Sequence, residues 1–169
     1  PLGSWMEAFV DWLIDVAGVF FDFLSEVLET LILTLVGAIE WMHPLAVIAV
    51  VLVGAWFLHR SIGLLVFISL ALLLILNLGY WVETIQTLVL VVSATFISVL
   101  IGVPLGIAAA HRPWLYTIMR PILDLMQTIP TFVYLIPTLI LLGLGYVPGL
   151  ISTIIFAVAA PIRLTYLGI

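Results

Sequence analysis

The chain has 169 residues, of which 66% are hydrophobic and only 8% charged, with a net charge of −5 and no cysteine. A soluble domain carries roughly 25% charged residues, and several apolar runs here are long enough to cross a bilayer, so we expect a helical integral membrane protein. The missing cysteines exclude disulfide and thiol chemistry, and the negative charge argues against nucleic acid as a partner.

The chain starts with Pro-Leu-Gly-Ser, which reads as a vector-derived remnant of protease cleavage, so we set residues 1–4 apart. Residues 5–31 have apolar side chains at helical spacing and predict an amphipathic helix about 40 Å long at ~1.5 Å per residue. Its opposite face is acidic, with Asp11, Asp15, Asp22, Glu26 and Glu29. Because the cytoplasmic leaflet is negative, we expect region 5–42 on the outer side, either as a packing or anchoring helix or as a docking surface for an extracytoplasmic partner.

Five apolar segments follow and predict about five transmembrane helices. They cover residues 44–58, 64–78, 84–110, 117–143 and 150–168. The first two lie within residues 43–81 and form a pair of accessory helices around a short polar turn. The predicted fold is therefore an all-α, multi-pass integral membrane protein with an amphipathic N-terminal helix.

The arginines orient the predicted helices. With the amphipathic helix outside, all four arginines fall toward the cytoplasm, at positions Arg60, Arg112, Arg120 and Arg163. This agrees with the enrichment of basic residues in cytoplasmic loops of membrane proteins.

Two prolines interrupt the predicted helix at residues 117–143. Pro130 and Pro137 lack an amide hydrogen and would leave the carbonyls of Met126 and Val133 unpaired. Helices broken in this way inside a bilayer line protein or a water-filled path, and they are typical of transport proteins. The polar residues around the prolines either form a translocation path with them or satisfy the freed carbonyls; they are Gln127, Thr128, Thr131, Tyr134 and Thr138.

Other motifs favour structural roles. The sequence Gly102-Val-Pro-Leu-Gly106 places Pro104 between two small residues and predicts close helix contact with a kink. Asp124 lies four residues after Arg120, so we expect an ion pair or helix cap in preference to a proton relay or cation site.

No motif predicts a cofactor, a metal site or an enzyme. His43, His59 and His111 fall in predicted turns and do not pair at metal-ligand spacing. The sequence also has no nucleophile–base pair and no glycine-rich phosphate loop.

The order of residues in the second half points to a family. The stretches Ile101-Gly-Val-Pro-Leu-Gly-Ile107, Met126-Gln-Thr-Ile-Pro-Thr-Phe-Val-Tyr-Leu-Ile-Pro137 and Pro161-Ile-Arg-Leu-Thr-Tyr-Leu-Gly-Ile169 closely resemble the permease subunit of glycine betaine/proline osmoprotectant ABC importers. The resemblance is tight over residues 84–169 and looser before them.

The resemblance implies a type I ABC importer permease in the bacterial cytoplasmic membrane. It implies a second permease copy, two cytoplasmic ATP-binding subunits that carry the ATPase activity, and an extracytoplasmic solute-binding protein or fused domain. The solute would be glycine betaine, proline, choline or carnitine. In that family the aromatic cage for the quaternary ammonium, a cation–π site, belongs to the binding protein.

Residues 82–169 would then be the first three helices of the permease core. In the family, the EAA loop that docks into the ATPase follows the equivalent of Leu167-Gly-Ile169, so we expect this chain to end before the loop and not to couple to ATP hydrolysis by itself. Two alternatives remain: a non-transporting membrane scaffold or assembly fragment, and a proton-coupled secondary carrier.

Overall fold

A computed structural model describes residues 2–169, except for the side chains of residues 2–4, 6, 7, 9–11, 13 and 14. The predicted cleavage remnant at 1–4 therefore lies outside the described side chains, as do Asp11 and part of the apolar face of the amphipathic pattern. Throughout the described part, the chain is α-helical apart from short connections and contains no strand. This confirms the predicted all-α fold.

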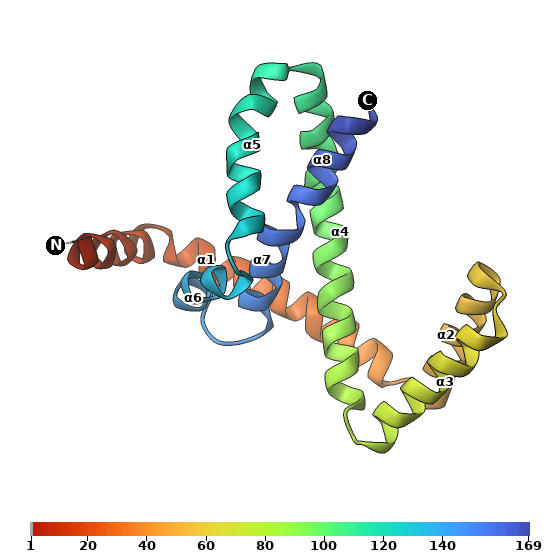
Figure 1. Ribbon diagram of the computed structural model, residues 1–169. Helices are drawn as coiled ribbons and strands as arrows, with labels where there is room; N and C mark the ends of the chain where they lie inside the picture. Colours follow the sequence, from red (N-terminus) through yellow and green to blue (C-terminus); the bar gives the residue numbers. More distant parts are fainter. Residues whose placement is uncertain (1) are drawn as a thin grey trace. The chain divides into compact units, whose positions relative to one another are not determined.

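Within the described residues there are eight helices, coloured in chain order in Figure 1. They are α1 (Leu2–Glu40), α2 (Pro44–His59), α3 (Ile62–Asn77), α4 (Trp81–His111), α5 (Pro113–Thr128), α6 (Thr131–Leu142), α7 (Tyr146–Ala157) and α8 (Ala159–Gly168). The helices form two compact units. One unit contains residues 1–31 and 90–169, and the other contains residues 32–89.

The helices fall on the predicted apolar segments, but within the described residues two of them, or four when bent pairs are counted, are long and apolar enough to span a bilayer, fewer than the five that the sequence predicts. Among the described residues, α4 and the continuous segment Tyr146–Gly168 (α7 and α8) are each long and apolar enough to span a bilayer. Two further segments qualify only as bent pairs, α1 with α2 at 95° and α5 with α6 at 94°, and α3 is a shorter apolar helix. Most bulky apolar side chains in these helices are exposed, which fits a protein whose solvent is lipid.

The segment at residues 117–143 differs from the single kinked helix that the sequence predicts. The chain leaves helical geometry at Ile129 (φ −77°, ψ 129°), and Pro130 becomes the N-cap of a separate helix, α6. A proline disfavours helical geometry at the residue before it, which explains why the segment breaks here. Pro137 stays inside α6, as Pro104 does inside α4. With 12 residues, α6 is about 18 Å long and too short to cross a bilayer alone.

In the unit that includes residues 90–169, α8 packs against both α4 and α5 (Figure 1). It runs antiparallel to α5, and the rings of Tyr116 and Tyr166 stack with centroids 3.6 Å apart and planes 5° apart. The core between these helices consists of Leu123, Val158, Ala159 and Ile162, with Met119 and Met126 partly buried against it. This packing positions the polar side chains of α5 beside those of α8.

Candidate functional site

The break between α5 and α6 is closed by side-chain hydroxyls. The carbonyl oxygen of Leu125 accepts hydrogen bonds from the amide of Ile129 at 3.1 Å, the Thr128 hydroxyl at 3.2 Å and the Tyr134 hydroxyl at 3.3 Å. The Ile129 amide already supplies the backbone bond to this carbonyl, so the two hydroxyls add further bonds, one from the last residue of α5 and one from α6. Thr128 and Tyr134 therefore stabilise the break, whichever other role they have.

A second group of hydroxyls joins α6 to α7. The Thr138 hydroxyl oxygen lies 2.9 Å from the carbonyl oxygens of both Tyr134 and Leu135, and 3.0 Å from the Ser152 hydroxyl oxygen. Ser152 donates to the carbonyl of Pro148 at 2.7 Å. Thr138 and Ser152 are only 7% and 4% exposed, so this is a buried contact between two helices. Sequence reasoning missed Ser152, because only the packing of α7 on α6 reveals its partner.

The remaining candidate path residues are less constrained. Gln127 is half-buried, and Thr131 and both prolines are exposed. In the part of the chain that the structure describes, no hydrogen bond involves the side chain of Gln127 or Thr131. Their polar groups are therefore available to a passing solute or to water.

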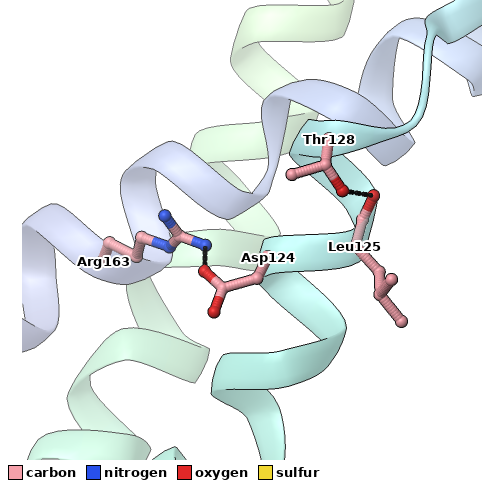
Figure 2. A network of polar contacts seen from close by, with 4 residues as sticks. All are labelled: Asp124, Leu125, Thr128 and Arg163. Atoms are coloured by element: carbon pink, nitrogen blue, oxygen red, sulfur yellow. Dashed lines mark hydrogen bonds and ion pairs between the residues drawn. The ribbon is translucent and has the colours of Figure 1, made fainter.

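Asp124 does not pair with Arg120, contrary to the prediction. Its Oδ1 atom lies 2.6 Å from Nη2 of Arg163, an ion pair that joins α5 to α8 (Figure 2). The sequence prediction was wrong because α8 folds back along α5 and brings a closer guanidinium to the carboxylate than the neighbour on its own helix. Figure 2 shows the two side chains pointing toward one another, with Leu125 next to Asp124 and with Thr128, whose hydroxyl is directed at the Leu125 carbonyl, one turn further along α5.

The Gly102 and Gly106 pair forms the contact of α4 with α8. A Cβ atom on Gly102 would lie 2.6 Å from Cγ of Pro161. Gly106 faces Thr165 at the same short distance. Small residues of this kind let helix backbones approach closely in membranes.

An apolar pocket of about 200 Å³ lies between α4, α5 and α8, with Leu105, Met119 and Met126 in its wall. Every side chain that lines it is apolar. A charged solute would lose its hydration there without gaining a polar partner, so the polar break of α5 is the better candidate site.

The histidines occupy helix ends. His43 is the N-cap of α2, where its Nδ1 atom accepts from the Leu45 amide at 3.3 Å, and His59 and His111 are the last residues of α2 and α4. Among the described residues, no group of three histidine or acidic side chains could hold a metal ion.

Comparison with known proteins finds similarity to a transport family in the C-terminal part of the chain. Residues 102–169 match the family described as "Binding-protein-dependent transport system inner membrane component". Over these residues the chain is similar to this family. The matched part contains the end of α4 and all of α5 to α8, and so includes both glycines of the α4–α8 contact, the Asp124–Arg163 pair and the α5–α6 break.

Curated relatives extend the similarity along the whole chain. The chain is 38% identical over 169 residues to the glycine betaine transport system permease protein OpuAB of Bacillus subtilis and 39% identical over 176 residues to the glycine betaine/carnitine transport permease protein GbuB of Listeria monocytogenes. It is 38% identical to the glycine betaine/proline betaine transport system permease protein ProW of Escherichia coli. All of this chain is covered in each comparison, but it spans only 60%, 61% and 48% of the respective relatives.

Proposed function

We propose that this chain belongs to the permease subunit of an ATP-driven importer for quaternary ammonium compatible solutes such as glycine betaine, proline, choline or carnitine. The observation that carries the proposal is the identity of 38–39%, along the whole chain, to permeases named for glycine betaine and carnitine transport. The match of residues 102–169 to a binding-protein-dependent membrane component supports it independently.

The break between α5 and α6 is the proposed wall of the translocation path. The proposed path residues are Gln127, Thr128, Pro130, Thr131, Tyr134, Pro137 and Thr138. A sharp bend in an apolar segment is tolerated in a membrane where it borders protein or water. Thr128 and Tyr134 stabilise the bend by their hydrogen bonds to the Leu125 carbonyl, and Thr138 joins α6 to α7. Gln127 and Thr131 retain polar groups for solute or water.

The proposed partners follow from this function. They are a second copy of the permease, cytoplasmic ATP-binding subunits that hydrolyse ATP, and an extracytoplasmic solute-binding protein or fused domain.

The proposed location is a bacterial cytoplasmic membrane. Thr165 lies against Gly106, so the C-terminal ends of α4 and α8 are on the same side. Arg112 and Arg163 therefore lie toward one face, which supports a cytoplasmic placement of that face.

A proton-coupled carrier fits the structure less well. Such a carrier needs an intramembrane group that exchanges protons, and the candidate carboxylate, Asp124, is engaged by Arg163 at 2.6 Å. The ion pair therefore favours the ATP-driven importer over the secondary carrier.

Transport by a reconstituted assembly tests the proposal. The full-length permease, its ATP-binding subunits and its solute-binding protein would be placed in proteoliposomes with ATP on the side of the ATP-binding subunits. Radiolabelled glycine betaine should accumulate only when ATP can be hydrolysed, and ATP-binding subunits that lack their catalytic glutamate serve as the control. Accumulation driven by a proton gradient without ATP would overturn the proposal, as would an absence of accumulation.

A further inference from the structure

The Asp124–Arg163 ion pair is placed where charges are costly. Asp124 lies in the last turns of α5, and Arg163 lies within the span Tyr146–Gly168. Their side chains are 54% and 30% exposed. Charged groups inside a membrane face a water-filled cavity or other protein, because contact with lipid is strongly unfavourable. The exposed part of this pair therefore faces the aqueous path or a neighbouring protein surface.

The ion pair uses only part of the hydrogen-bonding capacity of each side chain. A single contact joins Oδ1 of Asp124 to Nη2 of Arg163, whereas a guanidinium and a carboxylate often form two parallel hydrogen bonds. No other hydrogen bond to either side chain is present within the described part of the chain. Oδ2 of the aspartate and the remaining N–H donors of the arginine are thus open to a third party.

The surroundings of the pair belong to the proposed path. Thr128 lies one turn further along α5, and Figure 2 shows its hydroxyl directed at the Leu125 carbonyl on the same stretch of helix. Tyr134, at the start of α6, donates to the same carbonyl. The ion pair therefore lies within about one helical turn of a residue that closes the break between α5 and α6.

We propose that Asp124 and Arg163 form a binding station for zwitterionic solutes on the translocation path. This inference rests on the proposed function and narrows its solute class. The carboxylate of a betaine takes the free N–H donors of Arg163 in a charge-assisted contact. Its ammonium group lies against the free oxygen of Asp124 and is held by charge attraction.

The chemistry favours a zwitterion over a simple cation. When the station is empty, the two side chains neutralise one another, so no isolated charge remains in the membrane. A zwitterion has no net charge, so the site stays neutral when the carboxylate of the solute contacts Arg163 and its ammonium group contacts Asp124. Choline carries the cation but offers Arg163 only a neutral hydroxyl in place of a carboxylate, and a charge-assisted contact is stronger, so glycine betaine, proline and carnitine should bind here in preference to choline.

Cysteine labelling tests, with the native ion pair intact, whether the pair is accessible to water and which solutes bind beside it. Residues 1–169 contain no cysteine, so Thr128→Cys in a full-length, otherwise cysteine-free permease provides a single thiol beside the pair. A membrane-impermeant methanethiosulfonate that carries a trimethylammonium group should label it in the reconstituted assembly. Glycine betaine at millimolar concentration should slow labelling at least 5-fold, and choline at the same concentration less than 2-fold. Absence of labelling, or equal protection by both solutes, would overturn the proposal.

Transport by charge-neutral variants provides a second test of the proposed binding station. The double variant Asp124→Asn/Arg163→Gln keeps two hydrogen-bonding side chains between α5 and α8 but removes both charges. ATP-driven uptake of glycine betaine should fall at least 10-fold while ATP hydrolysis persists. A purely structural contact would leave uptake within 2-fold of the unaltered protein, and that result would overturn the proposal.

Arg120→Gln is the matched control. Arg120 is an exposed arginine of the same helix, and no carboxylate pairs with it among the described residues. Uptake by Arg120→Gln should stay within 2-fold of the unaltered protein. A loss of uptake as large as that of the Asp124→Asn/Arg163→Gln variant would overturn the proposal that the ion pair binds the solute. Failure of the unaltered assembly to accumulate glycine betaine would instead overturn the proposed function together with this inference. The labelling result stands even if the double variant does not assemble.

Discussion

Gly106 of α4 lies so close to Thr165 of α8 that a Cβ atom on the glycine would stand 2.6 Å from the threonine Cβ. The same added atom would lie 2.7 Å from the carbonyl oxygen of Ile162. One turn earlier, Gly102 makes an equivalent contact with Pro161. The absence of side chains at the two glycines therefore sets the distance between α4 and α8, and through α8 it positions the Asp124–Arg163 pair.

Replacement of Gly106 by alanine should separate these helices. Because one of the obstructing atoms is a backbone oxygen, the new methyl group can be accommodated only if a helix moves, and overpacking of this kind costs about 1–3 kcal/mol. We expect a lower midpoint of thermal unfolding for the full-length permease in detergent. Gly149→Ala is the control, because nothing lies within 4 Å of a Cβ atom there. Equal midpoints for the two variants would contradict the close contact.

Thr138→Val should weaken the contact between α6 and α7. Valine keeps the shape of threonine but removes the hydroxyl that bonds to backbone carbonyls and to Ser152. The loss of one buried hydrogen bond costs about 0.5–1.5 kcal/mol, measured as a shift in thermal unfolding. Thr153→Val is a matched control on α7, because the exposed Thr153 hydroxyl bonds only to the Gly149 carbonyl of its own helix. A larger effect at Thr153 would argue against the inter-helix role.

Ser98→Ala should raise stability. The Ser98 hydroxyl oxygen in α4 is the buried side-chain polar atom that has no hydrogen-bond partner among the described residues. Such a group costs about 1–3 kcal/mol when left unpaired, so its removal should increase the midpoint of thermal unfolding. Ser152→Ala should have the opposite effect, since the Ser152 hydroxyl is buried and bonded. Destabilisation by Ser98→Ala would show that the hydroxyl has a partner in the full assembly.

The sequence located the apolar helices because each is an apolar run with polar ends, a signal carried by neighbouring residues, but it predicted five spans where two, or four with bent pairs, qualify among the described residues. It also placed the interruption at Pro130, since proline acts on the residues beside it. The 94° bend between α5 and α6 could not be derived in this way, because the angle depends on the packing of α6 against α7.

The side-chain contacts of the candidate site could be identified only from the folded structure. Arg120 was the nearest arginine to Asp124 along the chain, yet Arg163 binds it from another helix at 2.6 Å. The roles of Thr128 and Tyr134 were open between a polar path and satisfied carbonyls. Their bonds go to the Leu125 carbonyl and not to the carbonyls of Met126 or Val133 that the prolines would free, so they stabilise the break and both roles stay predictions.

The helix α1 contacts the connection between α6 and α7. The Ser25 hydroxyl donates to the carbonyl of Leu142 at 3.2 Å. Leu142 is the last residue of α6, and its carbonyl has no partner within the helix. Glu29, one turn further along α1, lies with its Oε1 atom 3.4 Å from the position of a Cβ atom on Gly145. These contacts support a packing role for the acidic helix.

Ser25→Ala should therefore loosen this connection while leaving the helices intact. The hydrogen bond contributes about 0.5–1.5 kcal/mol, so the amides of residues 143–146 should exchange with deuterium severalfold faster in the full-length permease. Ser69→Ala is the control, because the Ser69 hydroxyl bonds to the Leu65 carbonyl within α3. Unchanged exchange at residues 143–146 in Ser25→Ala would show that the connection is held without α1, and would favour a docking role for the acidic face.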